Sequence, residues 1–159
     1  MKIIYAQSPI EIQGKSVFLA GPTPRSKDVK GWRKDFVNIF KDEGFEGTLL
    51  LPEFEDLKDF TVNFAYNKQI EWEHEAMERA DIILFWIPRT LPDMPAFTTN
   101  TEFGYWIAKN PSKIKLGIPD FAVKCDYIKY MANKENISIF NNKYDLIDEI
   151  NNINNIKYT

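Results

Sequence analysis

The chain has 159 residues, 44% of them hydrophobic, so it can bury one sizeable core and is expected to form a single domain over residues 1–159. Its formal charge of −3 provides no basic surface for a nucleic acid polymer or a membrane surface. Its one cysteine, Cys125, cannot form an internal disulfide, which favours a reducing cytoplasm. No apolar run approaches ~20 residues, so no segment is expected to span a bilayer.

Short apolar runs alternate with longer amphipathic segments, which is the pattern of a parallel sheet with crossover helices. In chain order, the expected elements are a strand at 16–20, a helix from about 32 to 44, a strand at 48–51, a helix at 66–80, a strand at 81–87, a helix at 99–109, a strand at 115–118, a helix at 125–133, a strand at 137–139 and a helix at 144–154. Five parallel strands with helices on both faces predict a flavodoxin-like, doubly wound α/β fold. Residues 3–6 and 10–12 are expected to add a hairpin at one edge.

The single histidine, His74, limits the chemistry available to the chain. A histidine-rich metal site is impossible, and any triad with a serine or cysteine nucleophile would have to use this one residue. The remaining candidates for acid, base or nucleophile are mostly carboxylates. We therefore expect neither a metal ion nor a cofactor.

In doubly wound sheets, ligands bind beyond the carboxyl ends of the strands, where helix N-termini also point. Side chains that follow the first three strands, or open the next helix, should gather there as a substrate site: Gly21, Pro22, Arg25, Glu53, Arg89, Asp93, Asn100 and Glu102. The polar half of the inward face of helix 66–80 adds Gln69 and Glu73 to this edge, where both need hydrogen-bond partners.

Several of these residues also fit structural roles. Thr99-x-x-Glu102 matches a capping box, in which the glutamate bonds back to the start of its own helix. Glu53 follows a proline and also fits a solvated loop, while Asp81 also fits the start of a strand. The two polar residues of helix 66–80 can equally bond backbone groups. On local pattern alone, the capping role is the better interpretation of Glu102.

Five short motifs then occur in a consistent order between residues 16 and 119. They are VFLAGP at 17–22, QxxWE at 69–73, ADIIL at 80–84, FWIPR at 85–89 and EFG at 102–104. In this order the chain resembles the nucleoside 2-deoxyribosyltransferase family, and in particular its deoxyribosyltransferase-like branch. The resemblance implies a flavodoxin-like fold and the transfer of 2-deoxyribose between nucleobases.

The resemblance also implies roles for individual residues. Glu102 matches the family's nucleophile, which attacks the anomeric carbon, and Asp81 matches an aspartate near the leaving base. Asp93 is the nearest match to a second aspartate, in the loop before the nucleophile. A neighbouring subunit often completes the site in this family, which implies a homo-oligomer and makes Tyr158 a candidate for that contribution.

The chemistry of an N-glycosidic bond suits these assignments. Its cleavage passes through an oxocarbenium-like state that a carboxylate stabilises and can trap covalently. The N-terminus of helix 99–109 is expected to keep Glu102 ionised, while Asp81 or Asp93 protonates the departing base. Gln69, Glu73 and Asn100 are expected to bind the sugar or the base.

Three functions remain open from the sequence. The first is a nucleoside deoxyribosyltransferase working by double displacement through Glu102. The second is a nucleoside or nucleotide N-glycosidase, in which water intercepts the same intermediate. Arg25, with Thr23 and Ser26, would favour the nucleotide version by holding a 5′-phosphate. The third is a nucleotide-binding module without catalysis.

Overall fold

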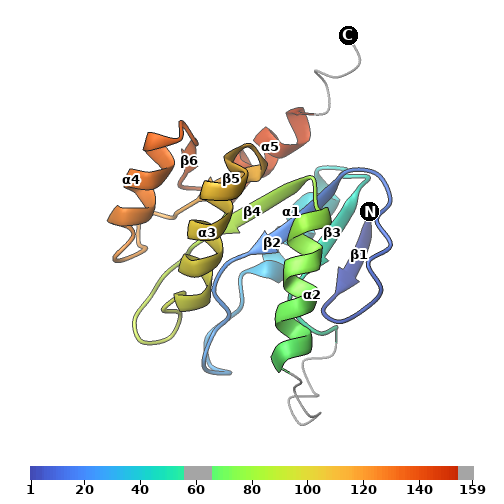
Figure 1. The fold of residues 1–159 in the computed structure, drawn as a ribbon, viewed down its shortest axis with the longest axis horizontal. Coiled ribbons are helices and arrows are strands. Elements are labelled where there is room, and N and C mark those ends of the chain that lie inside the picture. Colours follow the sequence, from blue (N-terminus) through green and yellow to red (C-terminus); the bar gives the residue numbers. More distant parts are fainter. Residues whose placement is uncertain (56–65, 154–159) are drawn as a thin grey trace.

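The computed structural model describes residues 1–55 and 66–153 as a six-stranded, all-parallel sheet covered by helices (Figure 1). The strands are β1 (Lys2–Tyr5), β2 (Ser16–Ala20), β3 (Thr48–Leu51), β4 (Ile82–Trp86), β5 (Ile114–Gly117) and β6 (Ile139–Phe140). They lie in the order β1-β3-β2-β4-β5-β6. Strands β2 to β6 therefore form the predicted flavodoxin-like arrangement, and β1 extends it at one edge.

Five α-helices and one short 3₁₀ helix are described, and their places agree with the apolar periodicity of the sequence. They are α1 (Arg33–Asp42), α2 (Tyr66–Arg79), α3 (Phe97–Lys109), η1 (Pro111–Lys113), α4 (Asp126–Lys134) and α5 (Lys143–Asn152). No helix in residues 1–55 and 66–153 is both long and apolar enough to cross a membrane.

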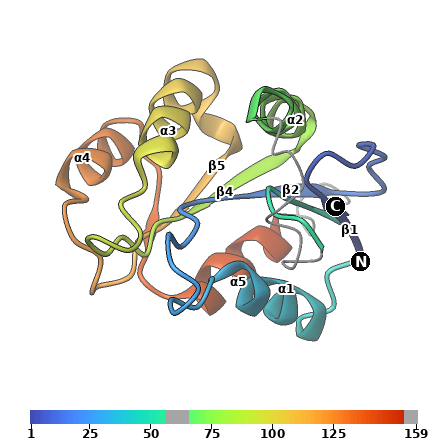
Figure 2. The ribbon, with the colours of Figure 1, turned by 90° about the horizontal axis from the view of Figure 1, so that it is seen from below.

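The helices divide between the two faces of the sheet, with α2, α3 and α4 on one face and α1 and α5 on the other (Figure 2). Successive strand residues alternate between these faces, as strand geometry requires. Phe18 and Phe85 belong to the core under α2, α3 and α4, whereas Leu19 and Leu84 belong to the core under α1 and α5. Burial on both faces explains why the central strands are continuous apolar runs.

The edge hairpin predicted from residues 3–6 and 10–12 is wrong. β1 pairs in parallel with β3, with Lys2 opposite Thr48, and residues 10–12 form no strand. Ile10 is instead buried in the same core as Ile4. The segment after β1 therefore contributes to the core on one face of the sheet and does not pair with the edge of the sheet.

The other predicted boundaries differ by small amounts. α3 begins at Phe97 rather than at residue 99, after Ala96 in a left-handed conformation with φ +61°. β6 covers Ile139–Phe140 rather than 137–139. The predicted helix end at 154 and the candidate Tyr158 lie outside the described residues.

Candidate active site

The carboxyl ends of β2, β3 and β4 lie side by side, and we call this edge of the sheet the rim. The turn after β2 begins at Gly21, whose φ is +151°. A Cβ there would lie 2.2 Å from the Trp86 carbonyl oxygen and 2.6 Å from the Trp32 ring, so the close approach requires glycine. The Pro22 carbonyl then accepts a hydrogen bond of 2.9 Å from Trp32 Nε1. Gly21 and Pro22 are therefore placed at the rim, as expected.

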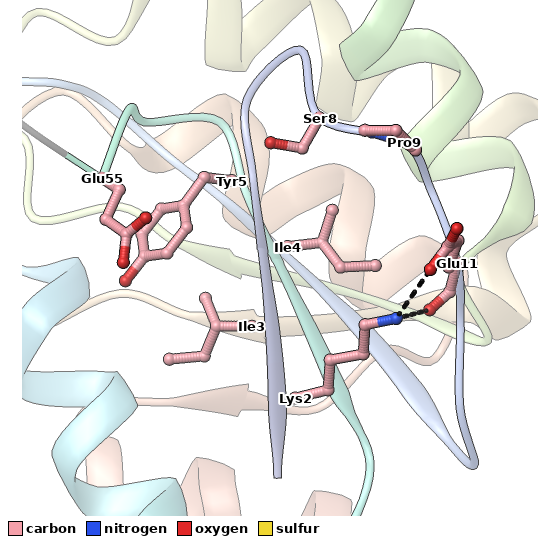
Figure 3. A pocket seen from close by; sticks show the side chains of 8 residues that line it. All are labelled: Lys2, Ile3, Ile4, Tyr5, Ser8, Pro9, Glu11 and Glu55. Atoms are coloured by element: carbon pink, nitrogen blue, oxygen red, sulfur yellow. Dashed lines mark hydrogen bonds and ion pairs between the residues drawn. The ribbon is translucent and has the colours of Figure 1, made fainter.

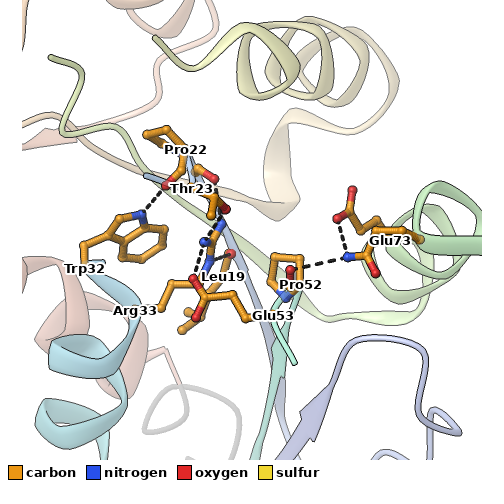
Figure 4. A network of polar contacts seen from close by, with 10 residues as sticks. Leu19, Pro22, Thr23, Trp32, Arg33, Pro52, Glu53 and Glu73 are labelled. Carbon is orange, nitrogen blue, oxygen red and sulfur yellow. Dashed lines mark hydrogen bonds and ion pairs between the residues drawn. The ribbon is translucent and has the colours of Figure 1, made fainter. Parts of the chain in front are cut away.

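Arg33, in the first turn of α1, ties this turn to the end of β3 (Figure 4). Its side chain is only 2% exposed. The guanidinium donates to the carbonyl oxygens of Leu19 and Gly21 at 3.0 and 2.6 Å. It also donates to Thr23 Oγ1 at 3.1 Å and forms an ion pair of 2.8 Å with Glu53. Glu53 is therefore a rim residue held by a buried cation, and not a free loop carboxylate.

Gln69 and Glu73 occupy the rim end of α2, as the sequence predicted. Gln69 is 6% exposed, and its Nε2 donates to Glu73 Oε1 at 2.7 Å and to the Pro52 carbonyl at 3.3 Å. Burial raises the pKa of Glu73, while the hydrogen bond from Gln69 and the charge of Arg33 oppose that rise. Glu73 is thus a partly buried carboxyl group oriented by its neighbour one turn earlier.

Glu102 lies in the second turn of α3, which begins at Phe97. The predicted capping box is therefore wrong, because Thr99 lies inside the helix and is only 3% exposed. The residue before the helix, Ala96, has no side chain that can cap. The electric field of a helix N-terminus falls off within the first turn. It therefore does not stabilise the ionised form of Glu102 as the sequence had suggested.

The surroundings of Glu102 favour its protonated form. Burial raises its pKa from 4.5 to about 8, with the negative charge of Glu73 adding to the rise and the charge of Arg33 opposing it. The expectation that Glu102 is ionised at neutral pH is thus wrong for the ligand-free protein. The negative charge of Glu73, on α2, thus acts on the buried carboxyl group of Glu102, on α3.

Arg89 and Asn100 are in direct contact. Arg89, just after β4, is 5% exposed and donates to Asn100 Oδ1 and to the Lys124 carbonyl oxygen. Its Nε is buried, and within the described residues it has no hydrogen-bond partner. Arg89 therefore links the end of β4 to α3 and to the loop before α4, and it orients an exposed amide two residues from Glu102.

Arg25 and Asp93 bring the loops after β2 and β4 together. The Arg25 amide donates to the Asp93 carbonyl oxygen at 3.0 Å, and the Arg25 guanidinium lies 5.1 Å from the centre of the Phe97 ring. Asp93 thus meets Arg25 through its main chain and not through its carboxylate. Thr23 Oγ1 accepts from Arg33, and Ser26 Oγ accepts from the Asp28 amide. Two of the three residues expected to hold a phosphate, Thr23 and Ser26, therefore bond to other groups, while the Arg25 guanidinium lies over the Phe97 ring.

Asp81 lies at the opposite edge of the sheet, just before β4 begins. Its Oδ2 accepts hydrogen bonds of 2.8 Å from both the amide and the hydroxyl of Ser16, the first residue of β2. Its own amide donates to the same hydroxyl at 2.9 Å. The expectation that Asp81 reaches the rim is wrong, because the amino ends of parallel strands meet at the far edge.

Arg33 is the rim residue that the sequence analysis missed. Its spacing from Phe36 and Phe40, three and seven positions later, places it on the apolar face of α1. A charged residue on such a face needs buried partners, so it signals a polar network. The sequence therefore contained the signal, an arginine on the same helix face as Phe36 and Phe40.

Two hollows lie away from the rim residues named above. One, of about 310 Å³, lies beside β1 and is lined by residues that include Tyr5, Glu11 and Glu55 (Figure 3). The other, of about 450 Å³, lies near η1 and includes Lys115 and Glu149, which form an ion pair. Across residues 1–55 and 66–153, no cluster of three or more histidine, cysteine or acidic residues is arranged to hold a metal ion.

The fold places this chain in the class of doubly wound α/β proteins, in which ligands generally bind at the carboxyl edge of the sheet. A family model described as nucleoside 2-deoxyribosyltransferase like matches residues 14–121, and the chain belongs to this family. The matched span contains the turn at Gly21, the rim end of α2 and Glu102. A comparison with curated proteins finds no match.

Proposed function

We propose that this chain is a nucleoside 2-deoxyribosyltransferase that works by double displacement through Glu102. The observation that carries the proposal is the buried carboxyl group of Glu102 on α3, whose pKa is raised by burial and by the charge of a second carboxyl group, Glu73 on α2. A nucleophile and a proton donor are what exchange at an N-glycosidic bond requires. The family to which the chain belongs supports this reaction class.

Burial favours a proton on Glu102 in the ligand-free protein, so the reactive state in the first half-reaction is the one in which Glu102 has released that proton and Glu73 carries one. A Glu102 carboxylate oxygen attacks the anomeric carbon, and the bond from that carbon to the base nitrogen breaks. The electron pair goes to the base, which takes the proton from Glu73 and leaves neutral. The products are a glycosyl ester on Glu102 and an ionised Glu73.

In the second half-reaction, an acceptor base enters and Glu73 takes its N–H proton. The base nitrogen attacks the anomeric carbon, and the ester bond to Glu102 breaks, which restores the starting charges. Glu73 is thus the acid in the first half-reaction and the base in the second. The sequence had suggested Asp81 or Asp93 for the acid. Asp81 lies at the other edge of the sheet, and Asp93 contacts Arg25 through its main chain.

The charges at the rim favour a neutral nucleoside over a 5′-monophosphate. Three carboxyl groups, on Glu53, Glu73 and Glu102, are accompanied by the buried Arg33, whose ion pair is with Glu53. Arg25 lies over the Phe97 ring, and Arg89 donates to Asn100 and Lys124. A phosphate would have to compete with the hydrogen-bond partners of Arg89 and approach like charges.

A product assay tests the proposal. The protein is incubated with 2′-deoxynucleosides of the common bases and with their 5′-monophosphates, each with and without a free acceptor base. Exchange of the base supports the transferase, whereas free deoxyribose or its phosphate would indicate an N-glycosidase. A nucleoside with fluorine at the 2′ position should add the mass of its sugar to the peptide that contains Glu102.

Glu102→Gln prepared in parallel is the control for contaminating activity. If no substrate reacts, and wild type and Glu102→Gln bind nucleosides equally well, the chain is a binding module and the catalytic proposal fails. Base exchange that persists in Glu102→Gln would contradict the assignment of the nucleophile.

A further inference from the structure

The turn after β1 is docked on the rim end of α2. β1 runs parallel to β3, so its carboxyl end lies next to the rim. Gln7 Nε2 donates to Gln69 Oε1 at 3.4 Å, and the Ser8 carbonyl oxygen accepts a hydrogen bond of 2.8 Å from Trp72 Nε1. The family model matches only from residue 14 onward, so this turn adds to the rim a segment that lies outside the match.

Gln7 has a backbone conformation that few residues other than glycine adopt. Its φ is +62°, in the left-handed region. The turn is held on both sides of Gln7, because the Ala6 amide donates to the Glu53 carbonyl oxygen at 3.0 Å and the Ser8 amide to the Tyr5 carbonyl oxygen at 3.1 Å. Glycine would adopt this φ without strain. What glutamine adds at this position is its side-chain amide.

The orientation of the Gln69 amide is fixed by its neighbours. Its Nε2 donates to the Pro52 carbonyl oxygen and to Glu73 Oε1. A carbonyl oxygen can only accept, so Nε2 faces Pro52 and Oε1 faces the turn after β1. Because Gln69 is only 6% exposed, its Oε1 needs a donor from the protein, and the described residues provide Gln7.

This orientation decides which oxygen of Glu73 carries a proton. Glu73 Oε1 accepts from Gln69, and in a protonated carboxyl group the better acceptor is the oxygen without the proton. The proton of a neutral Glu73 therefore lies on Oε2. If the Gln69 amide turned over, its own oxygen would face Glu73, and a protonated Glu73 would donate to Gln69 and not to a substrate.

We propose that Gln7 is a positioning residue, which acts through Gln69 to keep the transferable proton of Glu73 on Oε2. The catalytic consequence rests on the proposed function, in which Glu73 is the acid. The orientation of the Gln69 amide does not rest on it, and it is measurable in the ligand-free protein.

Gln7→Gly is the deciding variant, because glycine removes the side chain and accepts a φ of +62° without strain. It should fold as wild type does and lower kcat about three- to tenfold, the equivalent of one neutral hydrogen bond, with KM little changed. Asn136→Gly is the matched control, since Asn136 is exposed and has a φ of +57° in the turn between α4 and β6. This control should keep the activity of wild type.

The choice of leaving base separates proton delivery from general damage to the site. The variants are assayed with the best 2′-deoxynucleoside of the product assay and with a deoxynucleoside of N7-methylated guanine, whose base leaves without protonation. Gln7→Gly should slow the first substrate and leave the second near the wild-type rate. Equal losses with the two substrates would overturn the proposal.

A double-mutant cycle tests the route through Gln69. Gln69→Met removes the amide on which Gln7 acts, so adding Gln7→Gly to it should cause no further loss of kcat. A fully additive loss contradicts the proposal. Circular dichroism confirms that each variant is folded. Should Gln7→Gly fail to fold, Gln7→Asn replaces it, because asparagine also tolerates a positive φ and its side chain is one methylene shorter.

The ligand-free protein gives an independent measurement by NMR on protein carrying ¹⁵N at the glutamine side chains. The sequence has only Gln7, Gln13 and Gln69, and the Gln69 signals are assigned by their loss in Gln69→Met. In Gln7→Gly, the Gln69 amide signals should shift and their protons should exchange with water several-fold faster, with no change in Asn136→Gly. Unchanged Gln69 signals in Gln7→Gly would refute the role of Gln7. Absence of any reaction with nucleosides ends the proposed function alone.

Discussion

Acidic side chains at the two edges of the same parallel sheet have opposite environments. At the amino edge, the exposed Asp81 accepts hydrogen bonds from the amide and the hydroxyl of Ser16 and so joins β4 to β2. At the carboxyl edge, Glu102 is partly buried beside Glu73, and its pKa rises to about 8. The first carboxylate is satisfied by donors, and the second is held among groups that disfavour its charge.

Under the proposed function, this difference separates a carboxylate that stabilises the fold, Asp81, from one that takes part in the reaction, Glu102. Donors around a carboxylate stabilise the ionised form and the structure together. Desolvation beside a second carboxyl group costs folding free energy and leaves a group whose proton moves near neutral pH. The following predictions test that division, beginning with the largest expected effect.

Glu102→Gln should lower the rate of base exchange by on the order of 10³-fold or more, because an amide oxygen cannot form the glycosyl ester. Asp81→Asn, the matched change at the amino edge, should leave kcat/KM within about threefold of wild type. Both are measured by chromatography of the exchanged bases. Comparable losses in the two variants would show that the edges are not functionally distinct.

Glu73→Gln should slow exchange by roughly 10²-fold, the usual contribution of a positioned proton donor. Burial raises the pKa of Glu73, so in wild type the rate should fall at alkaline pH, where Glu73 loses the proton that it donates, and this fall should be absent in the variant. A deoxynucleoside of N7-methylated guanine, whose base leaves without protonation, is the control substrate. It should lose far less rate in Glu73→Gln, and an equal loss would remove Glu73 from the acid role.

Glu102→Gln should also stabilise the protein at alkaline pH. The folded pKa of about 8 lies above the ordinary 4.5, so the folded state binds the proton more tightly and the free energy of unfolding falls as pH rises between these values. We expect a gain of roughly 2–4 kcal/mol at about pH 9 and under about 1 kcal/mol at about pH 5. Urea unfolding at both pH values measures it, and an equal gain at each would refute the electrostatic cause.

Ser16→Ala should destabilise the protein by about 1 kcal/mol, because the Asp81 carboxylate and the Asp81 amide both lose the Ser16 hydroxyl. Base exchange per folded molecule should not change. The measurement is thermal unfolding together with the exchange assay. A large loss of kcat without loss of stability would place Asp81 in the catalytic machinery after all.

Most of the fold could be predicted because its signals are local. The apolar runs at β2, β3 and β4 and the 3.6-residue periodicity of α1 and α2 are visible in short windows of sequence. The pairing of β1 was not predictable in this way. A parallel partner is far away in the sequence, and a local pattern cannot distinguish it from a hairpin.

The positions of the candidate site residues were predictable where residue type and strand direction acted together. Gln69 and Glu73 reach the rim because the inward face of α2 becomes polar at one end. The prediction placed Asp81 at the rim, although it comes directly before β4 and therefore lies at the amino edge of the sheet. The ionisation state of Glu102 could not be predicted from the sequence. The charged groups that act on it, Glu73 and Arg33, lie on other helices, and their effect depends on the three-dimensional structure.

The pairing of β1 has a consequence for how this protein reaches its native state. Among the strands of residues 1–55 and 66–153, β1 pairs with β3 alone, and β3 also pairs with β2, so β1 joins the sheet only after β3, which follows it in the sequence, has formed. Contacts between sequence-distant strands slow folding, because a loop must close before they form. Residues 2–5 therefore have no partner strand during synthesis until β3 has been synthesised and has emerged from the ribosome.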